Sequence, residues 1–168
     1  RLVAPVFSGE RLIGYVGSCG HVTDIGGINP GSFAIRVPTH HAEGLRVPPV
    51  LFYRDGQVNE DVAKIILGNI RVPELTEGDL HAMTAAIHRA SERLLELAAT
   101  YGPDLLDAWM QSYLDYGEEK LREKVAALAD GCYEWTDWID ENPASGEPVQ
   151  IKLAIRVAGD QLSFDFTG

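Results

Sequence analysis

Helical signals fill the middle of this chain, and strand signals occupy both of its flanks. Apolar residues recur at helical spacing between about residues 59 and 128, whereas residues 2–16 and 133–166 hold short apolar or alternating segments bounded by turn residues. Strands followed by helices and then by strands do not build a doubly wound parallel sheet. We therefore predict an α+β fold, in which β-hairpins and a sheet flank a long antiparallel helical hairpin.

Capping residues and a Gly-Pro break divide the helical region. Asn59 suits the N-cap of a short helix over 60–67, and Thr76 is a candidate N-cap for a second helix that runs to about Tyr101. Gly102-Pro103 ends that helix, and proline suits the first turn of a third. The apolar positions predicted to be buried on the third helix are Leu105, Leu106, Trp109, Met110, Tyr113, Leu114, Leu121, Val125 and Leu128.

Turn residues mark the predicted strands. Ser8-Gly9-Glu10 joins residues 2–7 to 12–16 as a hairpin, and Arg54-Asp55-Gly56 closes a strand predicted over 50–53. The other apolar segments of this kind are 33–37, 133–139, 149–157 and 162–166. We expect three parts within one segment: 1–58, rich in strands, 59–130, helical, and 131–168, again rich in strands. Because both ends run through apolar segments, we also expect the chain to be an internal piece of a longer polypeptide.

Charge and cysteine usage narrow the class of protein. The 168 residues carry a formal net charge of −11, which argues against binding to nucleic acid or to an anionic membrane surface. No apolar run is long enough to span a bilayer. Cys19 and Cys132 lie far apart without paired spacing, so we predict reduced thiols in a cytoplasmic protein. The sequence also lacks a phosphate-binding P-loop and a dinucleotide-binding glycine motif.

The segment from His21 to Ser32 holds the first candidate site. His21 and Asp24 stand three positions apart, and imidazole and carboxylate are both common ligands of zinc, manganese and iron(II). The glycines that follow allow the backbone to bend closely around a cation. The structural alternative is that Asp24 braces its own glycine turn while His21 lies at the surface. The residues alone favour that alternative.

His40, His41 and Glu43 offer further ligands some twenty positions downstream. Adjacent histidines point to opposite sides of an extended chain, so at most one of the two would normally join His21 and Asp24. The alternative is an exposed polar turn before Pro48-Pro49. The residues do not decide between these two interpretations.

Several short motifs, taken together in order and spacing, resemble the hydantoinase B/oxoprolinase family, which includes the corresponding subunits of acetone and acetophenone carboxylases. The resemblance covers essentially the whole chain. The segments that carry it are Ala4-Pro5-Val6-Phe7, His21-Val22-Thr23-Asp24-Ile25-Gly26-Gly27, Pro30-Gly31-Ser32, Glu43-Gly44-Leu45-Arg46-Val47-Pro48-Pro49, Leu67-Gly68-Asn69-Ile70-Arg71-Val72-Pro73, Gly78-Asp79-Leu80 and Asp165-Phe166-Thr167-Gly168.

This resemblance implies ATP-dependent opening of a cyclic amide, such as a hydantoin or 5-oxoproline. It also implies a hetero-oligomer in which a hydantoinase A-type subunit or domain handles ATP. In the carboxylase branch, the His and Asp of the His-x-x-Asp loop are metal ligands. By position, that role falls to His21 and Asp24, with His41 as the preferred third ligand and His40 as the second choice. The implied cation is zinc, manganese or iron.

Two other functions remain open. The first is a subunit of an ATP-dependent ketone carboxylase, which would keep the same site and change the reaction. The second is a noncatalytic scaffold in which the helical hairpin docks other subunits, as the amphipathic pattern from Leu105 to Leu128 allows. We expect the isolated 168 residues to be inactive, and we assign no catalytic residue from the sequence.

Overall fold

The computed structural model describes residues 1–32, 37, 39–142 and 144–167. These residues form two compact units, 1–100 and 101–168, and we describe each unit by itself. Small antiparallel sheets and long helices make up both, which confirms the predicted α+β class. No helix among the described residues is long and apolar enough to cross a membrane. Residues 33–36 of the strand predicted over 33–37 lie outside the described part.

The first unit opens with the predicted hairpin. β1 (Leu2–Ser8) pairs antiparallel with β2 (Arg11–Ser18), and the register shifts between Val6 and Phe7. Gly9 takes a φ of 63° in the connecting turn, a conformation that costs glycine little. The turn residues in the sequence therefore predicted the position of this hairpin correctly.

The strand predicted over residues 50–53 is wrong in its bounds, because the structure has a second, smaller hairpin there. The strand is β3 (Tyr53–Arg54), which pairs with β4 (Gln57–Val58). The turn itself is where the sequence puts it, with φ of 50° at Asp55 and 76° at Gly56. Positive φ at both central residues is typical of the tight turn that matches strand twist. Only the residues that flank this turn find a pairing partner, so the strand is shorter and later than predicted.

Two helices complete the first unit. α1 (Glu60–Gly68) begins after Asn59, whose side chain accepts a hydrogen bond from the Val62 N–H at 3.4 Å, as predicted for an N-cap. α2 (Pro73–Tyr101) ends where the sequence predicts. Its start differs, because Pro73 occupies the first turn and Thr76 lies inside the helix with its N–H bonded to the Val72 carbonyl. The prediction of Thr76 as an N-cap was wrong.

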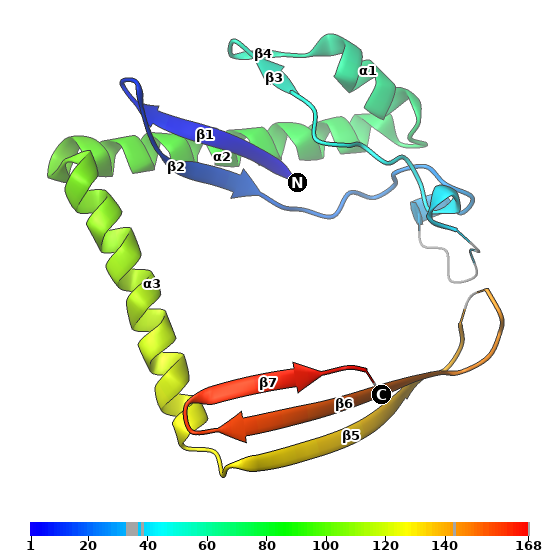
Figure 1. The fold of residues 1–168 in the computed structure, drawn as a ribbon. Helices are drawn as coiled ribbons and strands as arrows, with labels where there is room; N and C mark the ends of the chain where they lie inside the picture. The colour runs from blue at the N-terminus through cyan, green and yellow to red at the C-terminus, as the bar shows by residue number, and fades with distance from the viewer. Residues whose placement is uncertain (33–36, 38, 143, 168) are drawn as a thin grey trace. The chain divides into compact units, whose positions relative to one another are not determined.

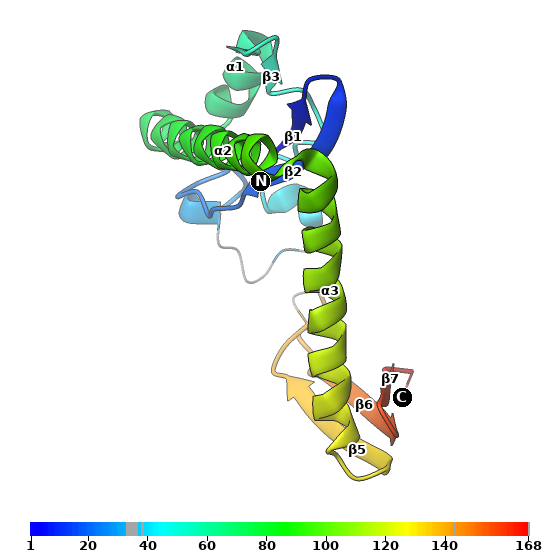
Figure 2. The ribbon, with the colours of Figure 1, turned by 90° about the vertical axis from the view of Figure 1, so that its left-hand side faces the viewer.

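The hairpin β1–β2 lies along α2 in both ribbon views (Figures 1 and 2). Gly14 of the hairpin faces this helix, since a Cβ there would lie 3.4 Å from the Leu94 side chain. The buried apolar residues of this unit are Val6, Ile13, Ile70, Met83, Ile87 and Ala98. The last three recur at helical spacing and so lie on one face of α2.

The second unit begins with α3 (Pro103–Ala126), which has Pro103 in its first turn as predicted. A three-stranded antiparallel sheet follows, in the order β5 (Gly131–Ile139), β6 (Val149–Ala158) and β7 (Gln161–Asp165). α3 packs against β7.

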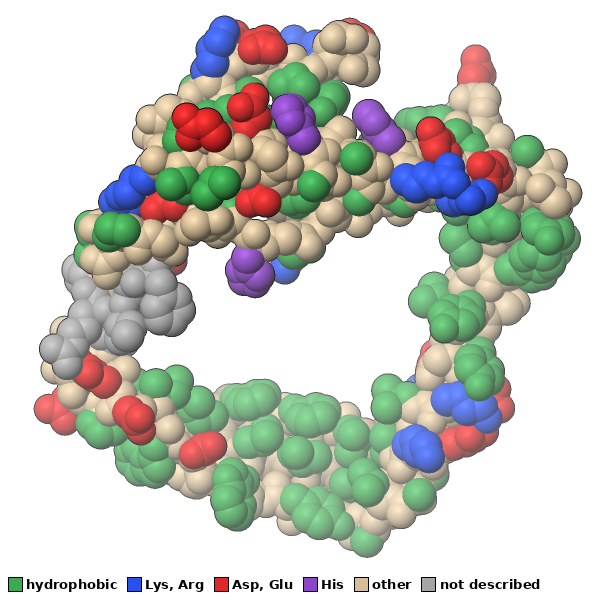
Figure 3. Space-filling model, turned by 180° about the vertical axis from the view of Figure 1, so that it is seen from behind, with side chains coloured by type: hydrophobic (Ala, Val, Ile, Leu, Met, Phe, Trp, Pro, Cys, Tyr) green, Lys and Arg blue, Asp and Glu red, His purple; other side chains and the backbone are tan. Residues whose placement is uncertain are grey.

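The predicted buried stripe of α3 is mostly exposed. Only Leu106 and Val125 of the nine predicted positions are buried. One face of the sheet is likewise apolar and open, because Trp135 is paired with Leu153 and next to it Tyr133 is paired with Ile155. Figure 3 shows hydrophobic side chains gathered over this sheet. The predicted antiparallel hairpin of the two long helices stays a prediction, since the helices belong to separately described units.

Candidate functional site

Three stretches that are distant in the sequence meet in the first unit, and we call them together the loop junction: residues 24–32, 42–45 and 69–71. Backbone hydrogen bonds tie the first two, from the Leu45 N–H to the Ile25 carbonyl (2.8 Å) and from the Ile28 N–H to the Ala42 carbonyl (3.0 Å). Each of the three stretches contains part of a motif that carries the family resemblance. These motif segments therefore lie at one place in the fold.

Glycines make this close approach possible. Gly27 has a φ of 81°, and a Cβ there would collide with the Glu43 carbonyl. A Cβ at Gly26 would lie 2.7 Å from the Asn69 carbonyl oxygen, and one at Gly44 would lie 2.7 Å from that of Ile25. Real side chains do not tolerate such distances, so these three positions require glycine. The backbone of the glycine loop therefore packs directly against the backbone of the other two stretches.

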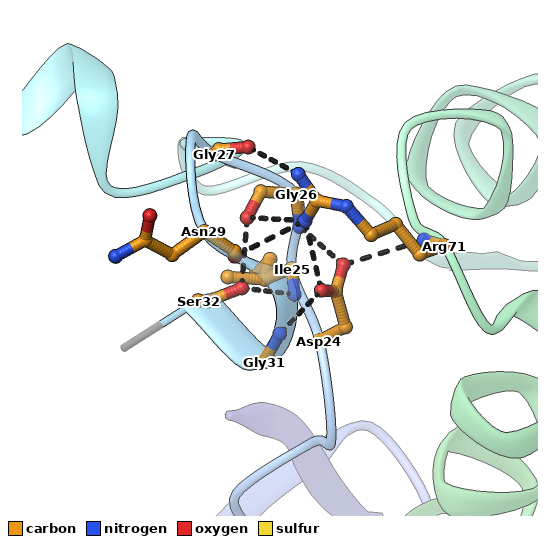
Figure 4. A network of polar contacts seen from close by, with 8 residues as sticks. All are labelled: Asp24, Ile25, Gly26, Gly27, Asn29, Gly31, Ser32 and Arg71. Carbon is orange, nitrogen blue, oxygen red and sulfur yellow. Dashed lines mark hydrogen bonds and ion pairs between the residues drawn. The ribbon is translucent and has the colours of Figure 1, made fainter. Parts of the chain in front are cut away.

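Asp24 is the buried centre of the junction, with a relative exposure of 2%. Its Oδ1 accepts hydrogen bonds from the N–H groups of Gly26 (2.8 Å) and Arg71 (3.3 Å). Its Oδ2 accepts from the Gly31 N–H and from the Arg71 guanidinium, both at 2.9 Å (Figure 4). The Gly26 N–H, then the other donors, hold the pKa of Asp24 well below its usual range, although burial opposes them. Asp24 is therefore an anchored carboxylate and not a proton carrier.

Arg71 binds the rest of the loop as well as Asp24. Its guanidinium donates to the carbonyl oxygens of Gly27 (2.6 Å), Asn29 (3.2 Å) and Gly26 (3.3 Å). Ser32 adds a second brace, because its hydroxyl accepts from the Ile25 N–H at 2.6 Å and donates to the Gly26 carbonyl at 2.9 Å. The planar fork of arginine suits this task, since it presents several donors in fixed directions. Sequence reasoning assigned no role to Arg71 or to Ser32.

The predicted metal ligands are not brought together. His21 is exposed, and His40 and His41 are exposed residues of the short 3-10 helix His40–Ala42. Within the described part of the chain, no three His, Cys, Asp or Glu side chains are arranged to hold a metal ion. Asp24 already accepts four hydrogen bonds and pairs with a guanidinium. As placed, the set His21, Asp24 and His41 does not fit a cation, and its metal role stays a prediction.

His40 and His41 instead form a cluster with an arginine. Their rings are in contact, with centroids 4.0 Å apart and planes tilted by 42°, and the Arg46 guanidinium donates a hydrogen bond to Nε2 of His40. Three effects lower the pKa of His40: the neighbouring His41 most, then burial, then Arg46. Glu43 raises it, and its effect is the smallest of the four. His40 is therefore held as a neutral imidazole beside a permanent cation.

The two cysteines of the chain and two further histidines are exposed. Cys19 and Cys132 are both exposed and free in the structure, and their reduced state stays a prediction. Further along the chain, His81 and His88 are exposed on α2, and His88 lies edge-on to the ring of Tyr53.

Comparison with known proteins identifies the family of the chain. The family model described as hydantoinase B/oxoprolinase matches residues 1–168. The chain is 33% identical over 169 residues to the B-type subunit of a putative D-/L-hydantoinase from Pseudomonas sp. (strain NS671), covering 98% of this chain and 28% of that protein. It is 26% identical over 165 residues to the acetophenone carboxylase delta subunit of Aromatoleum aromaticum, with 97% and 24% covered.

A solved structure agrees with these sequence matches. The crystal structure of the ATP-dependent caprolactamase from Pseudomonas jessenii superposes with a TM-score of 0.87 at 30% identity, over 96% of this chain and 28% of that one. The chain belongs to the hydantoinase B/oxoprolinase family. It spans less than a third of the length of the curated relatives it matches.

Proposed function

We propose that this chain is part of a B-type subunit that opens a cyclic amide, of the hydantoin or 5-oxoproline class, in an ATP-dependent reaction. The observation that carries the proposal is the loop junction, where four of the motif segments that carry the family resemblance meet around Asp24 and Arg71. Membership in the family, together with relatives named as a hydantoinase subunit and a caprolactamase, supports the amide substrate. A hydantoinase A-type partner would handle ATP.

The chemistry follows from the stability of the amide. Transfer of the γ-phosphoryl group of ATP to the amide oxygen gives ADP and an activated C–N unit that carries a good leaving group. One water then adds to the same carbon, the ring C–N bond breaks, and the nitrogen takes a proton, which leaves an amine and an acyl phosphate. A second water hydrolyses the acyl phosphate to the carboxylic acid and phosphate. The products are the ring-opened acid, ADP and phosphate.

The loop junction contributes rigidity to this reaction. Because Asp24, Arg71 and Ser32 fix the loop through backbone groups, the side chains mounted on its edge keep one geometry. Fixed polar groups stabilise developing charge better than groups that must reorganise. The divalent cation predicted at His21, Asp24 and His41 remains a prediction, and no step above depends on it.

The test is a turnover assay with the full-length protein and its A-type partner. ADP release should require a hydantoin, 5-oxoproline or a related lactam, and the ring-opened acid should appear in equal amount. ADP release that ignores every cyclic amide would overturn the proposal.

A ketone carboxylase is the second candidate, and the match to the acetophenone carboxylase delta subunit favours it. In that case turnover would require bicarbonate and a ketone. The same assay with and without bicarbonate separates the two reactions, since amide opening consumes water alone.

A noncatalytic scaffold is the third candidate, and the exposed apolar side chains of α3 favour it. Trp109, Tyr113 and Leu114 are 47%, 76% and 66% exposed. This role predicts that replacing them by glutamine disrupts assembly, while Asp24→Ala leaves the activity of an assembled complex intact. Loss of activity in an assembled Asp24→Ala complex would exclude it. The cytoplasmic location also remains a proposal.

A further inference from the structure

His40, His41 and Arg46 gather at the edge of the loop junction, and we call these three side chains the basic cluster. All three are exposed, so a ligand can reach them from solvent. The two imidazoles contact each other with tilted planes, and the guanidinium donates to Nε2 of His40. They form one surface feature in a chain whose formal net charge is −11.

The backbone beneath the basic cluster is fixed. The N–H groups of Ala42 and Glu43 bond to the carbonyls of Thr39 and His40, which closes the short 3-10 helix. The Ala42 carbonyl in turn accepts from the Ile28 N–H, and the Gly27 backbone lies so close that an added Cβ would meet the carbonyls of Ala42 and Glu43. The cluster is thus mounted on the same rigid junction that Asp24 and Arg71 hold together.

The hydrogen bonding of the cluster determines what it can bind. Because Nε2 of His40 accepts from Arg46, the ring proton of a neutral His40 resides on Nδ1 and is available as a donor. A guanidinium carries five N–H donors, so those not used by His40 can serve a ligand. A divalent cation here would have to displace Arg46 from Nε2 and would sit beside its positive charge. An anion would meet the donors of the cluster, and among the described residues Glu43 is the carboxylate that acts on His40.

We propose that Arg46, His40 and His41 form a binding site for an oxyanion, either a carboxylate or a phosphoryl group. Arginine presents paired donors that match both groups. Whether the ligand is a carboxylate of the substrate or a phosphoryl group derived from ATP rests on the proposed function. Binding of the oxyanion itself does not. This inference assigns the two histidines to an anion in place of the cation that the sequence suggested.

Arginine labelling tests the site in the full-length protein, with its partner present where the two form a complex. Phenylglyoxal modifies exposed arginines, and mass spectrometry reports the rate at each position. Inorganic phosphate at about ten times its Kd should slow modification of Arg46 about tenfold, because about one site in ten then remains free. Arg54 and Arg89, which are also exposed, serve as internal controls at matched ionic strength in chloride. Acetate in place of phosphate tests the carboxylate source.

Calorimetry gives an independent measurement. The heat of phosphate or acetate binding should disappear in Arg46→Ala and weaken severalfold in His41→Ala, while Arg54→Ala binds like the wild type. Equal protection of Arg46 and Arg54, or anion binding that survives Arg46→Ala, would overturn the site. So would saturable Mn²⁺ or Zn²⁺ binding that is lost in His41→Ala when neither anion binds. None of these results depends on turnover, so failure of the amide-opening assay leaves the oxyanion result standing.

Discussion

The guanidinium of Arg71 donates a hydrogen bond to Oδ2 of Asp24 at 2.9 Å, although 47 positions separate the two residues. The same guanidinium binds the carbonyls of Gly26, Gly27 and Asn29. One side chain from the segment between α1 and α2 therefore sets the shape of a glycine loop that follows β2. Whatever chemistry the loop supports depends on this contact.

Arg71→Lys should loosen the loop even though the charge is kept. A lysine ammonium is a compact point charge and cannot reproduce the planar fork that reaches Asp24 and three carbonyls. We expect the Gly26 and Gly31 amides, which bond to Asp24, to exchange severalfold faster with solvent, as measured by hydrogen–deuterium exchange. Arg89→Lys is the matched control, because Arg89 pairs with the exposed Glu92 of the next helical turn. Similar exchange in the two variants would contradict a special role for Arg71.

Acidification should weaken the loop junction through Asp24. The folded-state pKa of Asp24 lies below the value of an unfolded aspartate, so ionised Asp24 stabilises the protein above about pH 4, the unfolded value. That stabilisation is lost as the pH falls further, through the folded pKa. Asp24→Asn removes this dependence and places an NH₂ group among N–H donors.

Urea unfolding at neutral and acidic pH measures this effect. The wild type should exceed Asp24→Asn in unfolding free energy at neutral pH, and the gap should narrow on acidification below about pH 4. Glu77→Gln, at an exposed position of α2, should show no such narrowing. A gap that widens in acid would mean that Asp24 is not held in its ionised form.

Local signals in the sequence predicted the ends of several elements correctly. Asn59 caps α1, and Pro103 opens α3, because both effects act within one helical turn. The prediction of Thr76 as an N-cap was wrong because Pro73, three positions earlier, already lies in the first turn of α2. The stripe on α3 was predicted as buried from its spacing, but burial depends on what lies against a helix, and spacing alone does not supply that.

The sequence also predicted where the candidate site lies, but it did not predict most of the contacts within the site. The alternative that Asp24 braces its own glycine turn is borne out by the bonds from Gly26 and Gly31. Arg71 was missed, because an arginine 47 positions away carries no local mark of its partner. The one available signal was its place in the motif Asn69-Ile70-Arg71, which belongs to the resemblance. His40 contacts Arg46, which follows the 3-10 turn His40–Ala42 by only a few residues.

Gly27→Ala should destabilise the first unit strongly. Alanine would take a strained positive φ, and its Cβ would meet the carbonyls of Glu43 and Ala42. Gly56→Ala is the control, because Gly56 has nearly the same φ (76° against 81°) and no atom within 4 Å of the added Cβ. The control should cost about 1–2 kcal/mol of unfolding free energy from strain alone, and Gly27→Ala should cost clearly more. Equal losses by thermal unfolding would show that the close approach at Gly27 adds nothing.

In the sheet of the second unit, replacing a buried apolar residue should cost more unfolding free energy than replacing an exposed one. Val157 of β6 is 4% exposed, whereas Trp135 of β5 is 74% exposed. In the chain of residues 1–168, Val157→Ala should lower the unfolding free energy by about 1–2 kcal/mol, because it removes buried methyl groups from a packed position. Trp135→Ala should change it by less than about 1 kcal/mol, since most of the indole already contacts water. Urea unfolding followed by circular dichroism measures both. A larger loss for Trp135→Ala would mean that the apolar face of this sheet is covered, either by a second copy or by another part of the chain, and that its exposure is not a property of the folded unit.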